Sequence, residues 1–185
     1  MNFNVHSNLK GLHAPFSASK SSWLRYDDDK ALRFYENRKA KEKGTKIHEV
    51  AKTLIDLRIK QSTSKKSEYS YLYKYVNDAI GFRMDTEVVL FYSIRFFGTA
   101  DAISFRDKVL RIHDLKTGEL QASMDQLMVY AALFCLEYGI KPKNIETVLR
   151  IYQYDDYEEL IPEPEDIQHV MDIIIHFDML LQNVE

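Results

Sequence analysis

Three strand-like segments follow one another almost without interruption in the middle of the chain, and this succession limits the possible folds more than any other feature. Strands are predicted at about Thr86–Ile94, Phe96–Phe105 and Lys108–Lys116. The polar stretch Arg106–Lys108 separates the apolar runs, so the last two strands are expected to pair as a hairpin. Such a hairpin would bring Asp101 and Asp114, thirteen residues apart in the sequence, onto neighbouring strands.

The last of these strands carries polar groups on one face only. Successive side chains of a strand point to opposite faces, so Asp114 and Lys116 leave one face while His113 and Leu115 leave the other. A divalent cation needs oxygen ligands that converge from different elements. With Asp101 from the preceding strand, the sequence predicts two carboxylates and one ammonium side by side, which suits metal-dependent phosphodiester cleavage.

Helices are predicted on both sides of the strand region. The expected helices are a short one at Ser17–Leu24, one from about Asp27 to Lys41, and further ones at Thr45–Lys60, Tyr69–Ile80, Ser123–Tyr138 and beyond Pro164. Gly44 is expected to separate the second helix from the third, and another strand is expected at Glu146–Tyr154. The helix ending at Tyr138 is apolar almost all round, which indicates a buried position. We therefore expect one domain of the α/β or α+β class over residues 1–185.

Bulk composition excludes several classes of protein. The chain has 185 residues and is 45% hydrophobic, which is ordinary for a globular domain. No apolar run approaches the roughly 20 residues of a membrane span, and the polar start Met1–His6 lacks the apolar core of a signal peptide, so we expect a cytoplasmic protein without a membrane partner. A single cysteine, Cys135, excludes an internal disulfide and any four-cysteine zinc or iron–sulfur site, so a metal must rely on oxygen and imidazole ligands.

Charge is distributed unevenly along the chain. Residues 1–66 hold 15 Lys and Arg against 7 Asp and Glu, whereas residues 67–185 hold 10 against 21. A basic N-terminal third can follow a phosphate backbone even in a chain of net charge −3. Solvated helix faces explain the same charges equally well.

Single candidate residues outside the strands allow two interpretations each. His48 follows Gly44 by four residues and is either a metal ligand or, more commonly for a lone helical histidine, structural. Gln126 and Tyr130 share a helix face at i, i+4 and either hold a phosphate or pack as a core amide and phenol. Asp101 is either a ligand or a turn cap, and an Asp-x-Lys pair such as that ending in Lys116 is usually a surface pair.

Four short motifs occur in a characteristic order. They are Gly44-x-x-x-His48, Gly98-x-x-Asp101, Asp114-x-Lys116 and Gln126-x-x-x-Tyr130. In this order they resemble the motif set of RecB-type nucleases of the PD-(D/E)XK superfamily, which includes phage and CRISPR-associated exonucleases. The serine-rich segment at Ser17–Leu24 is similar to the start of some members. The resemblance extends from about residue 16 to the final helix.

The resemblance implies a fold and a set of roles. The fold is a restriction-endonuclease-like core, with a mixed central sheet flanked by helices. Mg²⁺ or Mn²⁺ would be held by His48, Asp101, Asp114 and the main-chain carbonyl of Leu115. Lys116 would serve the attacking water, Gln126 and Tyr130 would contact DNA or support the site, and Glu87 is a weaker candidate for a second metal. The iron–sulfur cysteines of some relatives are absent, and Asp114 stands where many members of the superfamily carry Glu.

The function implied by the resemblance is a metal-dependent DNA nuclease, of the phage exonuclease type, in DNA end processing or recombination. Besides DNA, the candidate partners are a recombination or replication protein and a second copy of the chain. The alternative is a nuclease-fold module that binds DNA or protein and has a vestigial metal site, which the acidic C-terminal two-thirds favours. The intact set of ligands favours the enzyme.

Overall fold

A computed structural model describes residues 14–16, 18–62, 69–118, 122–154 and 156–182. The chain divides into two compact units, an N-terminal unit, Met1–Thr45, and a main unit, Lys46–Glu185. Helix α1, Asp28–Asp56, begins in the first unit and ends in the second. In the described residues no helix is both long enough and apolar enough to cross a bilayer.

The N-terminal unit contains a short 3₁₀ helix, η2 (Ala18–Arg25), and the first part of α1. Asp27 caps α1, since its carboxylate accepts a hydrogen bond of 2.8 Å from the amide of Lys30. The ring of Phe16 packs against the rings of Phe34 and Tyr35. This aromatic contact holds the segment before η2 against the helix.

Helix α1 is continuous where the sequence analysis expected two helices, so the prediction that Gly44 separates them is wrong. A glycine inside a helix costs about 1 kcal/mol relative to alanine. The neighbouring residues are mostly long-chain helix formers, and Arg38 pairs with Glu42 one turn away. One glycine is therefore too small a perturbation to end this helix.

The main unit is built on a five-stranded sheet in the order β1-β2-β3-β4-β5. The strands are β1 (Asp85–Ser93), β2 (Phe96–Arg106), β3 (Val109–Leu115), β4 (Glu146–Gln153) and β5 (Asp156–Leu160). Only β3 and β4 pair in parallel, and the other neighbours are antiparallel. The predicted hairpin between β2 and β3 is confirmed, with Asp107 and Lys108 as a two-residue turn at φ 51° and 61°.

Strand β5 was not predicted. Its residues Asp156–Leu160 are mostly exposed and polar, so the segment lacks the apolar pattern by which strands are recognised. The other edge of the sheet is β1, where the amide of Phe91 donates a hydrogen bond of 2.8 Å to the carboxylate of Glu137. One main-chain donor of this edge is therefore already paired with a side chain.

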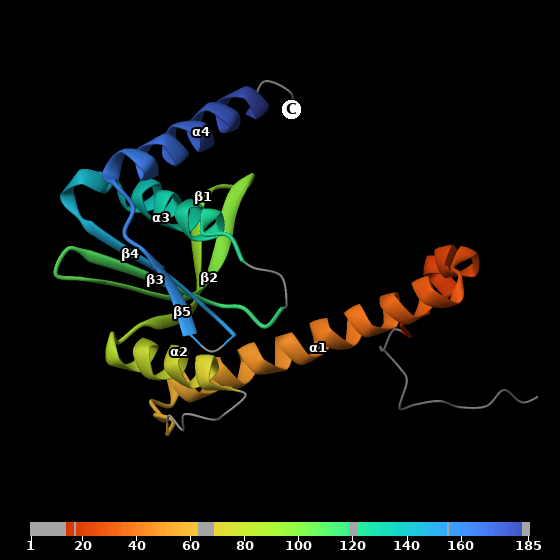
Figure 1. The fold of residues 1–185 in the computed structure, drawn as a ribbon. Helices are drawn as coiled ribbons and strands as arrows, with labels where there is room; N and C mark the ends of the chain where they lie inside the picture. Colours follow the sequence, from red (N-terminus) through yellow and green to blue (C-terminus); the bar gives the residue numbers. More distant parts are fainter. Residues whose placement is uncertain (1–13, 17, 63–68, 119–121, 155, 183–185) are drawn as a thin grey trace, which may run out of the picture. The chain divides into compact units, whose positions relative to one another are not determined.

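Helices cover both faces of the sheet (Figure 1). The remaining helices are α2 (Ser70–Gly81), α3 (Asp125–Tyr138), η3 (Pro142–Asn144) and α4 (Pro164–Gln182). The end of α1 and α2 bury Ile55, Val76 and Leu115 on one face, whereas α3 and α4 bury Leu127 and Ile167 on the other. The expected burial of α3 is confirmed, and the thiol of Cys135 on this helix is also buried. The class is thus α+β, with a mixed sheet flanked by helices.

Candidate functional site

The predicted polar groups gather where β3 ends. Leu115 belongs to the core beneath α2, and the ring of His113 meets Phe82 on the same side. The side chain of Lys116 reaches the other side, where its Nζ lies 2.9 Å from Asp114 Oδ2 and donates a 2.7 Å hydrogen bond to Gln126 Oε1. The predicted separation of the two faces is confirmed.

Gln126 links this ion pair to a tyrosine one turn along α3. Its Nε2 donates a hydrogen bond of 2.9 Å to the hydroxyl of Tyr130. The ring of Tyr130 lies against Gly98 of β2, where an added Cβ would be only 2.8 Å from Tyr130 Cε1. Gly98 therefore permits the close approach of ring and strand. Gln126 is exposed, so the alternative of a core glutamine is wrong.

Asp101 joins three elements. Its Oδ2 accepts a hydrogen bond of 3.0 Å from the amide of Leu115 and lies 3.4 Å from His48 Nδ1 on α1. The regular pairing of β2 with β3 stops at Ala102 and His113, so the carboxylate of Asp101 takes the place of the next ladder bond. Asp101 lies inside β2, so the alternative of a turn cap is wrong.

The Asp114 carboxylate is buried and incompletely partnered. Only 3% of the side chain is exposed, and Oδ2 has its ion pair with Lys116 but no well-aligned hydrogen bond within the described part of the chain. Burial raises the pKa of Asp114, and the charge of Asp101 raises it further, while Lys116 and His48 act in the opposite direction. Two carboxylates close together in a partly buried site favour the presence of a cation.

The donor set suits a hard cation, although a complete cage is not formed. Among the described residues no three His, Cys, Asp or Glu side chains already converge as a group around a metal position. Asp101 and His48 are adjacent, and Asp114 contributes a second carboxylate within electrostatic range of both. Oxygen donors with an imidazole match the preference of Mn²⁺ and are compatible with Mg²⁺.

Two residues near these groups were missed by the sequence analysis. Lys52 follows His48 by one helical turn, and its Nζ lies 3.8 Å from Glu87 Oε2. The second residue is Tyr75 of α2, whose hydroxyl interacts electrostatically with Asp101 and Asp114. Burial raises the pKa of Tyr75 well above its usual value, and the charges of Asp101 and Asp114 add to this effect. The i, i+4 spacing to His48 was the available signal for Lys52, whereas Tyr75 resembled any core tyrosine.

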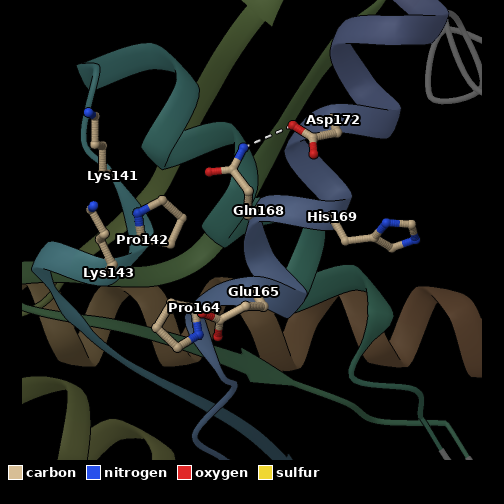
Figure 2. A pocket seen from close by; sticks show the side chains of 8 residues that line it. All are labelled: Lys141, Pro142, Lys143, Pro164, Glu165, Gln168, His169 and Asp172. Atoms are coloured by element: carbon tan, nitrogen blue, oxygen red, sulfur yellow. Dashed lines mark hydrogen bonds between the residues drawn. The ribbon is translucent and has the colours of Figure 1, made fainter.

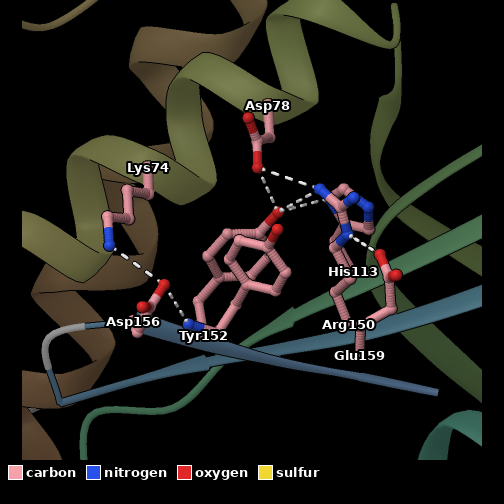
Figure 3. A network of polar contacts seen from close by, with 8 residues as sticks. Lys74, Asp78, His113, Arg150, Tyr152, Asp156 and Glu159 are labelled. Carbon is pink, nitrogen blue, oxygen red and sulfur yellow. Dashed lines mark hydrogen bonds and ion pairs between the residues drawn. The ribbon is translucent and has the colours of Figure 1, made fainter.

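A separate polar network lies between α2 and the sheet (Figure 3). The hydroxyl of Tyr152 donates a hydrogen bond of 2.6 Å to Asp78, which also pairs with Arg150 at 3.1 Å. Arg150 in turn contacts Glu159 on β5 at 2.6 Å. Burial and the nearby arginines lower the pKa of His113 to about 3, so this histidine is neutral. The network fastens α2 to β4 and β5, in agreement with a structural role for His113.

A cavity of about 490 Å³ lies near the start of α4 (Figure 2). Its lining includes Lys141 just before η3, Lys143 within η3, and Gln168 and Asp172 on α4. A hydrogen bond of 2.9 Å joins Gln168 to Asp172. The register of β3 with β4 places η3 at the opposite end of these strands from Asp114. This cavity is therefore distinct from the cluster of predicted site residues.

Four lysines of the basic N-terminal third are exposed on α1. They are Lys39, Lys41, Lys43 and Lys46. The ammonium of Lys39 lies 4.9 Å from the ring centre of Tyr35. Their exposure is compatible with either of the interpretations given above.

Comparisons with models of protein families, with curated proteins and with solved structures found no match to this chain.

Proposed function

We propose that the chain is a metal-dependent DNA nuclease with a PD-(D/E)XK-like core, of the phage exonuclease type, acting in DNA end processing or recombination. One observation carries the proposal: a continuous line of polar contacts runs from Asp114 through Lys116 and Gln126 to Tyr130. The four residues come from two of the four motifs. The mixed sheet with helices on both faces supports the same core.

The residues that would hold the metal are Asp101, Asp114, His48 and the main-chain carbonyl of Leu115. When bound, Mg²⁺ or Mn²⁺ polarises the phosphodiester group and lowers the pKa of a water molecule. The buried, under-partnered oxygen of Asp114 and the adjacency of Asp101 and His48 support this assignment. No cysteine ligand is needed.

The protein's own side chains position the reactants. Lys116 is held between Asp114 and Gln126, so its ammonium has a fixed place from which to orient the attacking water. The backbone amide of Lys116 donates a hydrogen bond of 2.9 Å to the main-chain carbonyl of Tyr152 on β4, which fixes the chain at this point. The Tyr130 hydroxyl accepts from Gln126, which leaves its own proton for a phosphate oxygen of DNA.

The second candidate function is a DNA- or protein-binding module with a vestigial metal site. It is favoured by the absence, within the described ranges, of any three-ligand group of His, Cys, Asp and Glu. The retention of Lys116 and its two partners favours the enzyme, because a binding module has no need of an ammonium held in this position.

The deciding experiment is digestion of end-labelled DNA with Mg²⁺, Mn²⁺ or EDTA. We expect cleavage with either metal, greater with Mn²⁺, and none with excess EDTA. Lys116→Ala and Asp114→Asn should each lower the rate by about 10²–10⁴-fold or more, since a positioned acid–base group contributes on this scale. DNA binding should persist in both variants.

Lys74→Ala is the matched control, because Lys74 is also an ion-paired lysine but lies on α2 and contacts Asp156. It should cleave as the wild type does. Equal cleavage by wild type and both site variants, or activity in EDTA, would contradict the proposal and leave the binding module as the better explanation.

A further inference from the structure

Helix α1 places three polar side chains along the β1–β2 hairpin. His48, Lys52 and Asp56 are spaced four residues apart, so they lie on one helix face. His48 lies 3.4 Å from Asp101, and Lys52 Nζ donates a hydrogen bond of 3.1 Å to the hydroxyl of Thr86. That hydroxyl donates one of 2.7 Å to Asp56, which also pairs with Lys52. The ammonium of Lys52 is thus held from two sides beside the candidate site.

Along β1, the side chains switch from one face of the sheet to the other at Glu87. The hydroxyl of Thr86 reaches Asp56 of α1, whereas Val88, two residues later, packs on the core beneath α3. Glu87 itself has a φ of 52°, which is rare for a residue other than glycine and marks local backbone strain inside β1. Pairing of Thr86 with Ala102 and of Val88 with Ala100 places Glu87 opposite Asp101.

We propose that Lys52 is a built-in cation that pairs with Glu87 and limits the candidate site to one divalent metal ion. The inference rests on the proposed function, because it concerns the metal that the nuclease would use. Two-metal sites hold their ions about 3.5–4 Å apart, and the second ion needs carboxylate ligands of its own. The carboxylate available for that purpose, Glu87, faces the ammonium of Lys52 at 3.8 Å.

The charge of Lys52 is fixed as well as its position. The hydrogen bond to Asp56 raises the pKa of Lys52, and the charges of Asp56 and Glu87 act in the same direction, so the side chain stays protonated at neutral pH. A divalent ion could bind Glu87 only by displacing this ammonium, which the carboxylate of Asp56 also holds in place. Asp101 and Asp114 are left to bind a single ion with His48.

The test counts bound Mn²⁺ on the full, EDTA-stripped chain by calorimetric titration and by electron paramagnetic resonance, without substrate. We expect one ion per chain for the wild type and two for Lys52→Met, which removes the charge but keeps the length of the side chain. Lys74→Met is the control, because Lys74 is equally exposed and is also paired with an aspartate. It should bind one ion.

Glu87→Gln provides a second variant with little risk to folding, since 56% of the Glu87 side chain is exposed. Alone it should leave one ion bound with unchanged affinity, and added to Lys52→Met it should return the count from two to one. Two ions in the wild type, one ion in Lys52→Met, or weaker binding in Glu87→Gln would overturn the inference while leaving the nuclease possible. No bound ion in the wild type would overturn both proposals.

Discussion

At the scale of single residues, Asp114 carries an unfavourably buried charge. The carboxylate is buried near a second acid, and the ammonium of Lys116 compensates it only in part. A buried charge that is only partly compensated lowers the stability of the folded chain, but it leaves the carboxylate able to bind a cation. The folded chain without metal should therefore be less stable than a variant in which the charge is absent.

The first consequence concerns pH and stability. The pKa of Asp114 in the folded chain is raised above its ordinary value of 3.8. The wild type therefore loses stability as pH rises from that ordinary value through the folded-state pKa. Asp114→Asn does not titrate. Measured in EDTA, its melting temperature should exceed that of the wild type at neutral pH, and the difference should shrink towards zero below about pH 4. A difference that is independent of pH would contradict this account of Asp114.

A tyrosine hydroxyl gives a second prediction at this scale. Tyr152 donates to Asp78 and lies 3.3 Å from the Nδ1 of His113, whose Nε2 has no partner among the described residues. Tyr152→Phe removes these contacts inside the protein and should lower the free energy of unfolding by about 1–3 kcal/mol. Urea unfolding would measure the change.

The control for this substitution is Tyr138→Phe, because 56% of Tyr138 is exposed. An exposed hydroxyl is solvated before and after folding, so its removal should change stability by less than about 0.5 kcal/mol. A similar decrease in both variants would mean that the buried network does not contribute in the manner described.

At the scale of elements, the contact of α3 with β2 depends on one glycine. An added Cβ at Gly98 would meet the ring of Tyr130 at 2.8 Å. Gly98→Ala should therefore displace Tyr130, break its hydrogen bond with Gln126 and lower stability by about 1–3 kcal/mol. We expect the cleavage rate to fall as well.

Gly81→Ala is the matched control, since among the described residues nothing beyond the neighbouring backbone of its own helix lies within 4 Å of the added Cβ, and the residue ends α2. It should leave both stability and cleavage close to the wild-type values. In the double variant Gly98→Ala, Tyr130→Ala, space is restored without the hydroxyl. Its stability should recover more than its activity, and equal recovery of both would contradict a role for Tyr130 in the site.

Elements also show how far sequence can predict this protein. The β2–β3 hairpin and the separation of faces at Asp114 were predicted, because strand alternation is strictly local. The prediction that the helix breaks at Gly44 was wrong, because one residue of low helix propensity does not end a helix whose other residues favour it. The strand β5 was missed because it is exposed, and the position of Lys52 over Glu87 depends on how α1 docks on the hairpin. Docking is a long-range property that local patterns do not encode.

At the scale of the whole molecule, the basic N-terminal third gives a prediction about DNA affinity. Changing Lys39, Lys41, Lys43 and Lys46 to Glu should weaken DNA binding in EDTA. It should also reduce the slope of log affinity against log salt by about 0.9 for each DNA phosphate that the protein no longer neutralises. Fluorescence anisotropy with labelled duplex at several salt concentrations would measure both.

The control is reversal of Lys141 and Lys143, which are exposed but lie at the opposite end of the central strands from Asp114. Their reversal should have a smaller effect on affinity and slope. If the two sets of reversals gave the same result, the lysines of α1 would be only a solvated helix face.

The hydrogen bond from Phe91 to Glu137 affects whether the β1 edge can pair with a strand of a second copy of the chain. An edge strand with free amides and exposed apolar side chains, as at Val89 and Phe91, is a template for strand addition and aggregation. The carboxylate of Glu137 occupies one outward amide of that edge and places a negative charge where another strand would have to bind. A contact that looks like a minor link between α3 and β1 thus also protects the solubility of the sheet.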